Sequence, residues 1–204
     1  MTVKDIYDYL NSIAPFDTAE EWDNCGLNVG SFDKDVKKIY IALDVTNDVL
    51  EAAKSFGADL VITHHPMLFN PVSQILCDSI VYKAVASGMS FIASHTCLDK
   101  AEGGVNHCLA SKVGIKNLKT SENDGFLKFG EIETCTAEEF AKKIKSALGG
   151  AVSFTDAGIV LATIFAAAAA AFVRFIAALA LAKGLRAATF CARFIIRIHT
   201  YIIL

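Results

Sequence analysis

Two short clusters of histidine and carboxylate side chains each follow an apolar run in this 204-residue sequence. His64 and His65 come directly after the first run, and His95 and Asp99 follow the second run about thirty residues later. Imidazole and carboxylate groups are typical ligands of zinc, manganese and iron. The spacing therefore predicts a metal site, if the fold brings the two clusters together.

The apolar runs at residues 59–63 and 90–94 have the features of buried strands, because they are short and rich in β-branched or aromatic residues. A helical pattern that ends at Gly88 separates them, and it consists of Ile75, Ile80, Val81, Ala84 and Val85. Strand, helix and strand form a βαβ unit, in which the two strands are parallel neighbours. Both clusters then lie at the carboxyl ends of adjacent strands, where α/β sheets bind their ligands.

The same alternation continues through residues 1–157 and predicts an α/β fold, a mixed sheet with parallel strands and flanking helices. Capping boxes begin helices at Thr2 and Thr136. The other expected strands and helices cover residues 38–43, 46–56, 126–132 and 151–155. A turn-rich stretch covers residues 21–30, and its Trp22-Asp23-Asn24 is interpreted as a turn with one buried ring or as part of a polar site.

Successive side chains on an extended chain point to opposite sides, and Pro66 favours an extended His65. We therefore expect His64 and His65 to hold two different ions, which favours a two-metal site over a closed structural zinc. Asp99 completes one of these shells. His95 is interpreted as a ligand, an orienting neighbour or a general base, and we favour the orienting role beside the metal. In a hydrolase, His95 is also the catalytic residue available to carry a proton.

Composition restricts the class of protein. The formal net charge is −3, so no global charge signal predicts a nucleic-acid partner. The six cysteines show no CxxC spacing, which predicts free thiols and a cytoplasmic location. The amino-terminal residues form an amphipathic pattern that contains an acid, unlike a signal peptide.

The composition changes abruptly near residue 158. Residues 1–157 contain 14 basic and 22 acidic residues, a net charge of −8, whereas residues 158–204 contain five basic residues and no acid. Three explanations remain open for this apolar, alanine-rich tail: a membrane segment, a translation out of frame or alanine-filled stretch, and a buried element. The lack of turn residues favours the second, and we expect residues 159–173 to be helical or disordered.

Three motifs together resemble the Nif-three-like family of dinuclear metal-centre proteins, which are homologues of type 2 GTP cyclohydrolase I. They are Glu21-Trp22-Asp23-Asn24-Cys25-Gly26-Leu27, Ile62-Thr63-His64-His65-Pro66, and Ser94-His95-Thr96-Cys97-Leu98-Asp99 with Gly103-Gly104-Val105-Asn106. The resemblance covers residues 1–157. It implies a two-lobed α/β fold in which His64, His65 and Asp99 bind two divalent ions of zinc, manganese or iron.

The resemblance also implies a function and partners. A metal-dependent hydrolase would open the guanine imidazole ring of GTP and release formate, with a small molecule such as a nucleotide as substrate; the substrate-binding residues stay unknown. The chain would form a ring, commonly a homohexamer. The alternatives are a non-catalytic metal-binding scaffold that forms a ring oligomer, and a membrane-associated truncated form.

One part of the family pattern is missing from this chain. The family completes its site with a Gly-His-x-x-x-Glu motif near the carboxyl terminus, but the tail contains no glutamate. Its one histidine, His199, lacks the preceding glycine, and a forced alignment places Arg197 and Tyr201 at the ligand positions. Because an arginine cation repels metal, we expect the tail to supply no ligand and the site to be incomplete.

Overall fold

A computed structural model describes residues 1–122, 125–149, 151–154, 160–164, 186–189 and 198–200. The chain divides into two compact units, which are described separately below. The first unit comprises Met1–Leu98 and Phe172–Cys191, and the second comprises Asp99–Ala171 and Ala192–Leu204. The division of the sequence at residue 157 stays a prediction about composition.

A five-stranded mixed sheet forms the centre of the first unit, with the strand order β1-β4-β3-β2-β9. Its strands are β1 (Gly26–Val29), β2 (Lys38–Ala42), β3 (Leu60–Thr63), β4 (Ser90–Ala93) and β9 (Arg186–Thr189). Strands β2, β3 and β4 are parallel neighbours, with Ile41 opposite Ile62 and Ile62 opposite Ile92. The predicted parallel βαβ arrangement is therefore confirmed. Strand β1 runs antiparallel to β4 and places Gly26 opposite Ala93.

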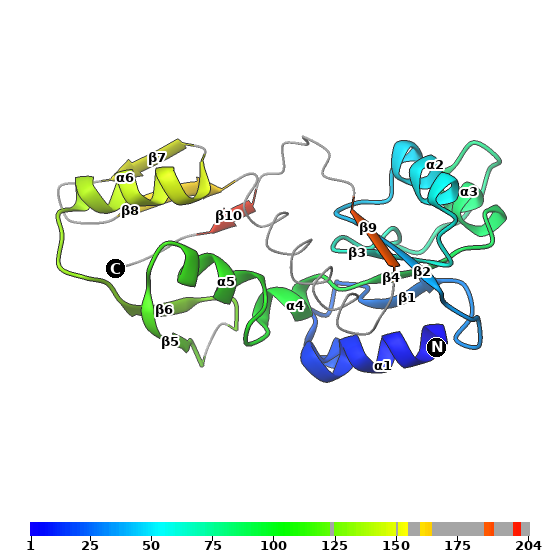
Figure 1. Cartoon of the computed structure of the whole chain (residues 1–204), viewed down its shortest axis with the longest axis horizontal. Coiled ribbons are helices and arrows are strands. Elements are labelled where there is room, and N and C mark those ends of the chain that lie inside the picture. Colours follow the sequence, from blue (N-terminus) through cyan, green and yellow to red (C-terminus); the bar gives the residue numbers. More distant parts are fainter. Residues whose placement is uncertain (123–124, 150, 155–159, 165–185, 190–197, 201–204) are drawn as a thin grey trace. The chain divides into compact units, whose positions relative to one another are not determined.

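Helices cover both faces of this sheet, with α1 on one side and α2 and α3 on the other (Figure 1). Their bounds are α1 (Val3–Ile13), α2 (Asn47–Phe56) and α3 (Ile80–Ala86), and a short 3-10 helix covers Phe16–Thr18. Thr2 caps α1 in the predicted capping box. Burial of Phe91, Ile62 and Ile92 in the sheet supplies much of the apolar area that holds the layers together.

Two local predictions in this unit are wrong in detail. The helix between β3 and β4 begins at Ile80 after the Ser79 cap, and Ile75 lies outside it with 51% of its surface exposed. Residues 21–30 contain strand β1 as well as turns, and the short helix α4 (Thr96–Lys100) follows His95. Short elements of this kind carry too few residues to show a periodic pattern.

The second unit contains a hairpin and a small sheet. Its elements are α5 (Val105–Lys112), β5 (Lys116–Thr120), β6 (Lys128–Glu131), α6 (Ala137–Leu148), β7 (Ala151–Phe154), β8 (Val160–Ile164) and β10 (Ile198–Thr200). Strands β5 and β6 pair antiparallel, and β10, β8 and β7 form an antiparallel sheet in that order. The capping box at Thr136 begins α6, whose buried Phe140 and Ile144 form the apolar face of the helix.

The described part of the tail is extended, which corrects the expectation of helix or disorder for residues 159–173. Val160–Ile164 forms strand β8, because this segment is rich in β-branched residues and comes before the run of alanines. The rest of that stretch lies outside the described residues. Strand β9 extends the first sheet beside β2. Among the described residues, no helix combines the length and apolar character needed to cross a bilayer.

Candidate metal centre

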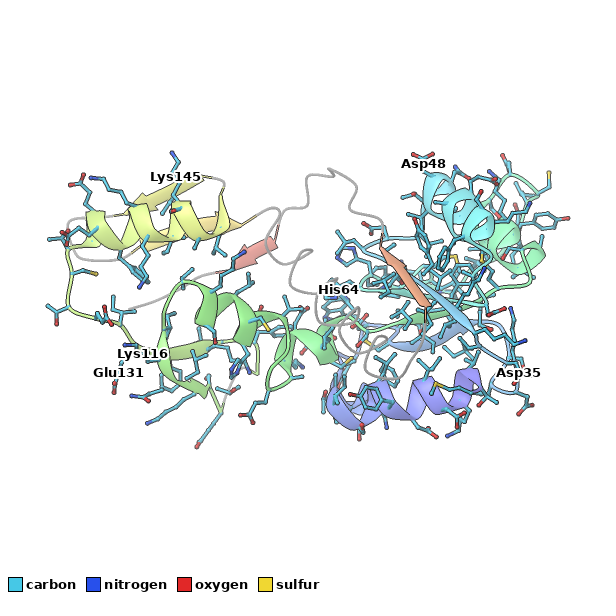
Figure 2. All side chains as sticks on the ribbon, in the orientation of Figure 1. Asp35, Asp48, His64, Lys116, Glu131 and Lys145 are labelled. Atoms are coloured by element: carbon cyan, nitrogen blue, oxygen red, sulfur yellow. The ribbon has the colours of Figure 1, made fainter. Side chains whose placement is uncertain are left out.

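The chemistry-bearing residues of the first unit gather at one edge of its sheet. His64 and His65 follow the end of β3, and His95 follows the end of the neighbouring β4. Asp44 follows β2, and Asp23 precedes β1, which starts at this edge because it runs antiparallel to β4. Figure 2 labels His64 in the first unit. The expectation that parallel strands deliver the histidines together is therefore confirmed.

The three imidazole rings are in close contact. Their ring centroids lie 4.9 Å apart for His64 and His65, 5.0 Å for His64 and His95, and 5.2 Å for His65 and His95. One ring nitrogen from each lies within 4.8 Å of the others, so they could hold metal. His64 and His65 do not point to opposite sides as expected, because the chain bends after Thr63, whose hydroxyl donates to the His65 carbonyl over 2.8 Å.

Each histidine has its Nδ1 atom beside an oxygen that can only accept a hydrogen bond. The partners are the Ser94 carbonyl for His64 at 3.0 Å, the Asp44 carboxylate for His65 at 2.7 Å, and the Asp23 carboxylate for His95 at 3.1 Å. In a neutral ring, Nδ1 must therefore carry the proton. That tautomer has its lone pair on Nε2, which is the form of imidazole that binds a metal or accepts a proton.

Burial keeps His64 in this neutral form. The residue is only 2% exposed, and burial, followed by the neighbouring His65 and His95, lowers the pKa of His64 from 6.5 to about 3. A buried imidazolium next to two further imidazoles would lose its hydration without gaining a partner charge. The donor set thus fits a divalent cation, because a neutral, oriented imidazole lies at the centre of the cluster.

Asp23 is a fully buried carboxylate that orients His95. Its Oδ1 atom accepts from His95, and its Oδ2 atom accepts from the Thr96 backbone N–H at 3.0 Å, from the Thr96 hydroxyl and from the Cys25 thiol. Burial alone would raise the pKa of Asp23, but the hydrogen bonds from His95 and Thr96 outweigh it and hold that pKa well below its usual value. Asp23 is therefore an anion that can stabilise a proton on His95.

Asp99 lies on α4 and is the first residue of the second unit. Its role as a ligand stays a prediction. His64, His65 and His95 are the one group of three or more candidate donors found among the described residues. The side chain of His199 lies outside the described part of the chain, although its backbone belongs to β10 opposite Thr163.

Two site residues, Asp44 and Asp23, were given no individual role from the sequence, although Asp23 belongs to a motif that was considered as part of a polar site. Asp44 comes after a strand that was predicted correctly, so the rule that polar residues at carboxyl ends of parallel strands meet would have found it. Asp23 comes before an antiparallel strand that was not predicted, and no local pattern reveals that strand. Its partner His95 lies 72 residues away in the sequence.

The aromatic ring of Trp22 is exposed, not buried, which corrects one interpretation of the Trp22-Asp23-Asn24 turn. Trp22 is 60% exposed and stacks on Phe69, with a centroid distance of 6.3 Å and an interplanar angle of 25°. Both rings also meet His95 edge-on, at 6.0 Å from Trp22 and 5.6 Å from Phe69. The Asn24 side chain donates to the Leu68 carbonyl over 2.6 Å and ties the two segments together.

The thiols of Cys25 and Cys97 are in contact with each other next to His95. The Sγ atoms of Cys25 and Cys97 are 3.4 Å apart, and the backbone N–H of His95 donates to the Cys25 sulfur over 3.3 Å. The five cysteines that the structure describes are all free, as expected, and Cys191 lies outside the described residues.

Comparison with known proteins finds relatives of this chain. A family model described as Duf34/NIF3 (NGG1p interacting factor 3) matches residues 1–171. A Clostridium perfringens protein named GTP cyclohydrolase 1 type 2 homolog is 34% identical over 160 residues, which cover 73% of this chain and 61% of the relative. A Staphylococcus epidermidis protein of the same name is 32% identical over 151 residues, which cover 72% and 41%.

Solved structures show the same fold. HcgD from Methanocaldococcus jannaschii has a TM-score of 0.77 at 23% identity, over 93% of this chain and 97% of that one. Staphylococcus aureus protein SA1388 has a TM-score of 0.56 at 36% identity, over 59% and 35%. The chain spans only 61% and 41% of the two curated relatives named above. Because the family model covers most of its length and all the residues of the histidine cluster, this chain belongs to the Duf34/NIF3 family.

Proposed function

We propose that this chain is a metal-dependent hydrolase that acts on a guanine nucleotide and opens the imidazole ring with release of formate. The observation that carries the proposal is the convergence of three imidazoles, each held at Nδ1 by an oxygen acceptor, with one ring nitrogen of each within 4.8 Å of the others. The names of the curated relatives, GTP cyclohydrolase 1 type 2 homolog, suggest the reaction and the substrate.

In this proposal His64 and His65 hold two divalent ions of zinc, manganese or iron, and Asp99 completes one of the two shells. Bound divalent ions supply Lewis-acid chemistry that makes water a nucleophile at neutral pH. Ser94 and Asp44 keep the two imidazoles in the tautomer that such ions need. One ring nitrogen from each of His64, His65 and His95 lies within 4.8 Å of the others, which supports metal binding at this cluster.

His95 carries the proton in this proposal, and Asp23 is its positioning residue. The buried carboxylate fixes Nδ1–H and leaves Nε2 free to accept a proton from water and to return it to a leaving nitrogen. Asp23 stabilises the imidazolium that forms meanwhile, as in other His–Asp pairs. We also propose a cytoplasmic, homo-oligomeric protein, for which the five free thiols and the family resemblance give support.

The test measures metal content and formate release from GTP in the same preparations. We expect wild-type protein to contain a transition metal by elemental analysis and to release formate, and we expect the His64→Ala, His65→Ala double variant to lose both. His107→Ala, on helix α5, is the matched histidine control. Equal metal content in wild type and the double variant would refute the site. Metal binding without turnover of GTP would support the non-catalytic scaffold instead.

A further inference from the structure

Two large aromatic rings remain exposed beside the histidine cluster. Trp22 is 60% exposed and Phe69 is 42% exposed, although rings of this size gain much by burial. The two rings lie nearly parallel to each other, at an interplanar angle of 25°. Each of them also makes an edge-type contact with the imidazole ring of His95. An exposed aromatic pair therefore lies next to the candidate centre.

Hydrogen bonds at one neighbouring residue of each ring, Asp23 for Trp22 and Leu68 for Phe69, hold the chain next to the ring in place. Trp22 precedes Asp23, whose carboxylate accepts from His95, Thr96 and Cys25. Phe69 follows Leu68, whose carbonyl accepts from the Asn24 amide at 2.6 Å. The chain positions next to the rings are thus fixed by buried or site-forming contacts. An exposed aromatic pair on an anchored backbone is a preformed surface, and ligands bind such surfaces with little loss of conformational entropy.

We propose that Trp22 and Phe69 form a stacking platform for the planar base of a purine nucleotide, next to the reacting centre. Every nucleobase has a π-face, and stacking on aromatic side chains is a common way to hold one. The Trp22 and Phe69 ring centroids lie 6.0 Å and 5.6 Å from that of His95, so a base stacked on this pair would lie next to the imidazole that carries the proton. The choice of a purine nucleotide rests on the proposed function, whereas the platform itself rests on ring geometry and exposure.

Trp22 is the one tryptophan in the sequence, so intrinsic fluorescence reports on this platform directly. The full chain is titrated with GTP in the presence of a chelator, with excitation at the red edge of indole absorption, where guanine does not absorb. We expect saturable quenching by GTP and none by an equimolar mixture of ribose 5-phosphate and inorganic triphosphate. Stacking energies predict that Phe69→Leu weakens GTP binding by about 5- to 150-fold.

Phe32→Leu is the matched control, because Phe32 is 38% exposed in the same unit and packs against Tyr7. It should leave the GTP affinity unchanged. Quenching that the non-aromatic mixture reproduces, or an affinity that Phe69→Leu and Phe32→Leu change equally, would overturn the platform. Calorimetry on Trp22→Ala provides a second measurement that needs no fluorophore, and an unchanged GTP affinity there would also overturn it.

The outcome separates this inference from the proposed hydrolase. GTP binding that depends on Phe69 without any formate release supports the platform and refutes the hydrolase. Formate release with a Trp22 signal that GTP does not change refutes the platform and supports the hydrolase.

Discussion

The substitution Asp23→Asn tests the His95 arrangement with almost no change of shape. The Asp23 carboxylate is fully buried, and three of its five hydrogen-bond donors meet Oδ2, while His95 and the Asn24 backbone N–H meet Oδ1. The amide oxygen of the asparagine should therefore take the Oδ2 position. Its NH2 group then faces the Nδ1–H of His95 and the Asn24 backbone N–H, so that it opposes two donors.

A buried donor without an acceptor costs about 1–3 kcal/mol, so the proton of His95 should move to Nε2 to relieve the conflict. That tautomer has no lone pair where the proposed reaction needs one. We expect turnover to fall by about 10²–10⁴-fold, the usual contribution of a positioned acid or base. The free energy of unfolding should fall by about 1.5–3 kcal/mol, because the hydrogen bonds lose their charged acceptor.

Nitrogen-15 NMR of the imidazole rings measures the tautomer directly, and the sequence contains only five histidines to assign. Metal affinity from calorimetry and formate release are measured on the same samples. Asp44→Asn is the comparison, and its effect should be smaller because the Asp44 side chain is 42% exposed and water can replace its contact. His95 protonated at Nδ1 in Asp23→Asn would refute the reasoning. If Asp23→Asn lowered the metal affinity 10–100-fold, His95 would be a metal ligand and not the residue that carries the proton.

Three further predictions concern stability and the thiols. Unfolded His64 takes up a proton below pH 6.5, but the folded residue does so only near pH 3, so the free energy of unfolding of the metal-free protein should fall by about 1.4 kcal/mol between pH 7.5 and 5.5. Urea unfolding at both pH values checks this prediction. A His64→Gln variant that keeps the same loss would contradict it. Gly57→Ala should lower the free energy of unfolding by about 1 kcal/mol, because this residue ends α2 with a φ of 72°; an unchanged midpoint of thermal unfolding would argue against that strain. A small oxidising disulfide should convert the Cys25 and Cys97 thiols, now 3.4 Å apart, into one disulfide while it is itself reduced to two thiols; peptide mass spectrometry that finds both still reduced would count against the pairing.

The parts of the fold that could be predicted are those with a repeated local pattern. Strands β2, β3 and β4 each show a continuous apolar run, and Thr2 and Thr136 each start a helix with a capping box, so both kinds of element were predicted within one or two residues. The rule for carboxyl ends of parallel strands then brought His64, His65 and His95 together.

The rest depended on long-range contacts or on local bends that leave no periodic signal. Strand β1 has four residues and is defined by its pairing with β4, so Asp23 could not be placed at the site. The bend after Thr63, stabilised by its own hydroxyl, brought the His64 and His65 rings to the same side. Trp22 was open to either interpretation, because exposure depends on neighbours that the sequence does not reveal.

The antiparallel pairing of β1 with β4 also sets an order in which the chain can assemble the centre. Strand β1 stands at the end of the strand order and leaves the ribosome before its sheet neighbour β4. It can pair only once β4 is synthesised, because its Gly26 lies opposite Ala93 of that strand. Closing the 72-residue loop between Asp23 and His95 costs about 0.8 kcal/mol more entropy than closing the 30-residue loop from His64 to Ser94. We therefore expect the imidazoles to meet first, as the βαβ unit folds, and the carboxylate that orients His95 to arrive last. A nascent chain would thus gain its metal-binding groups before it gains the means to move a proton.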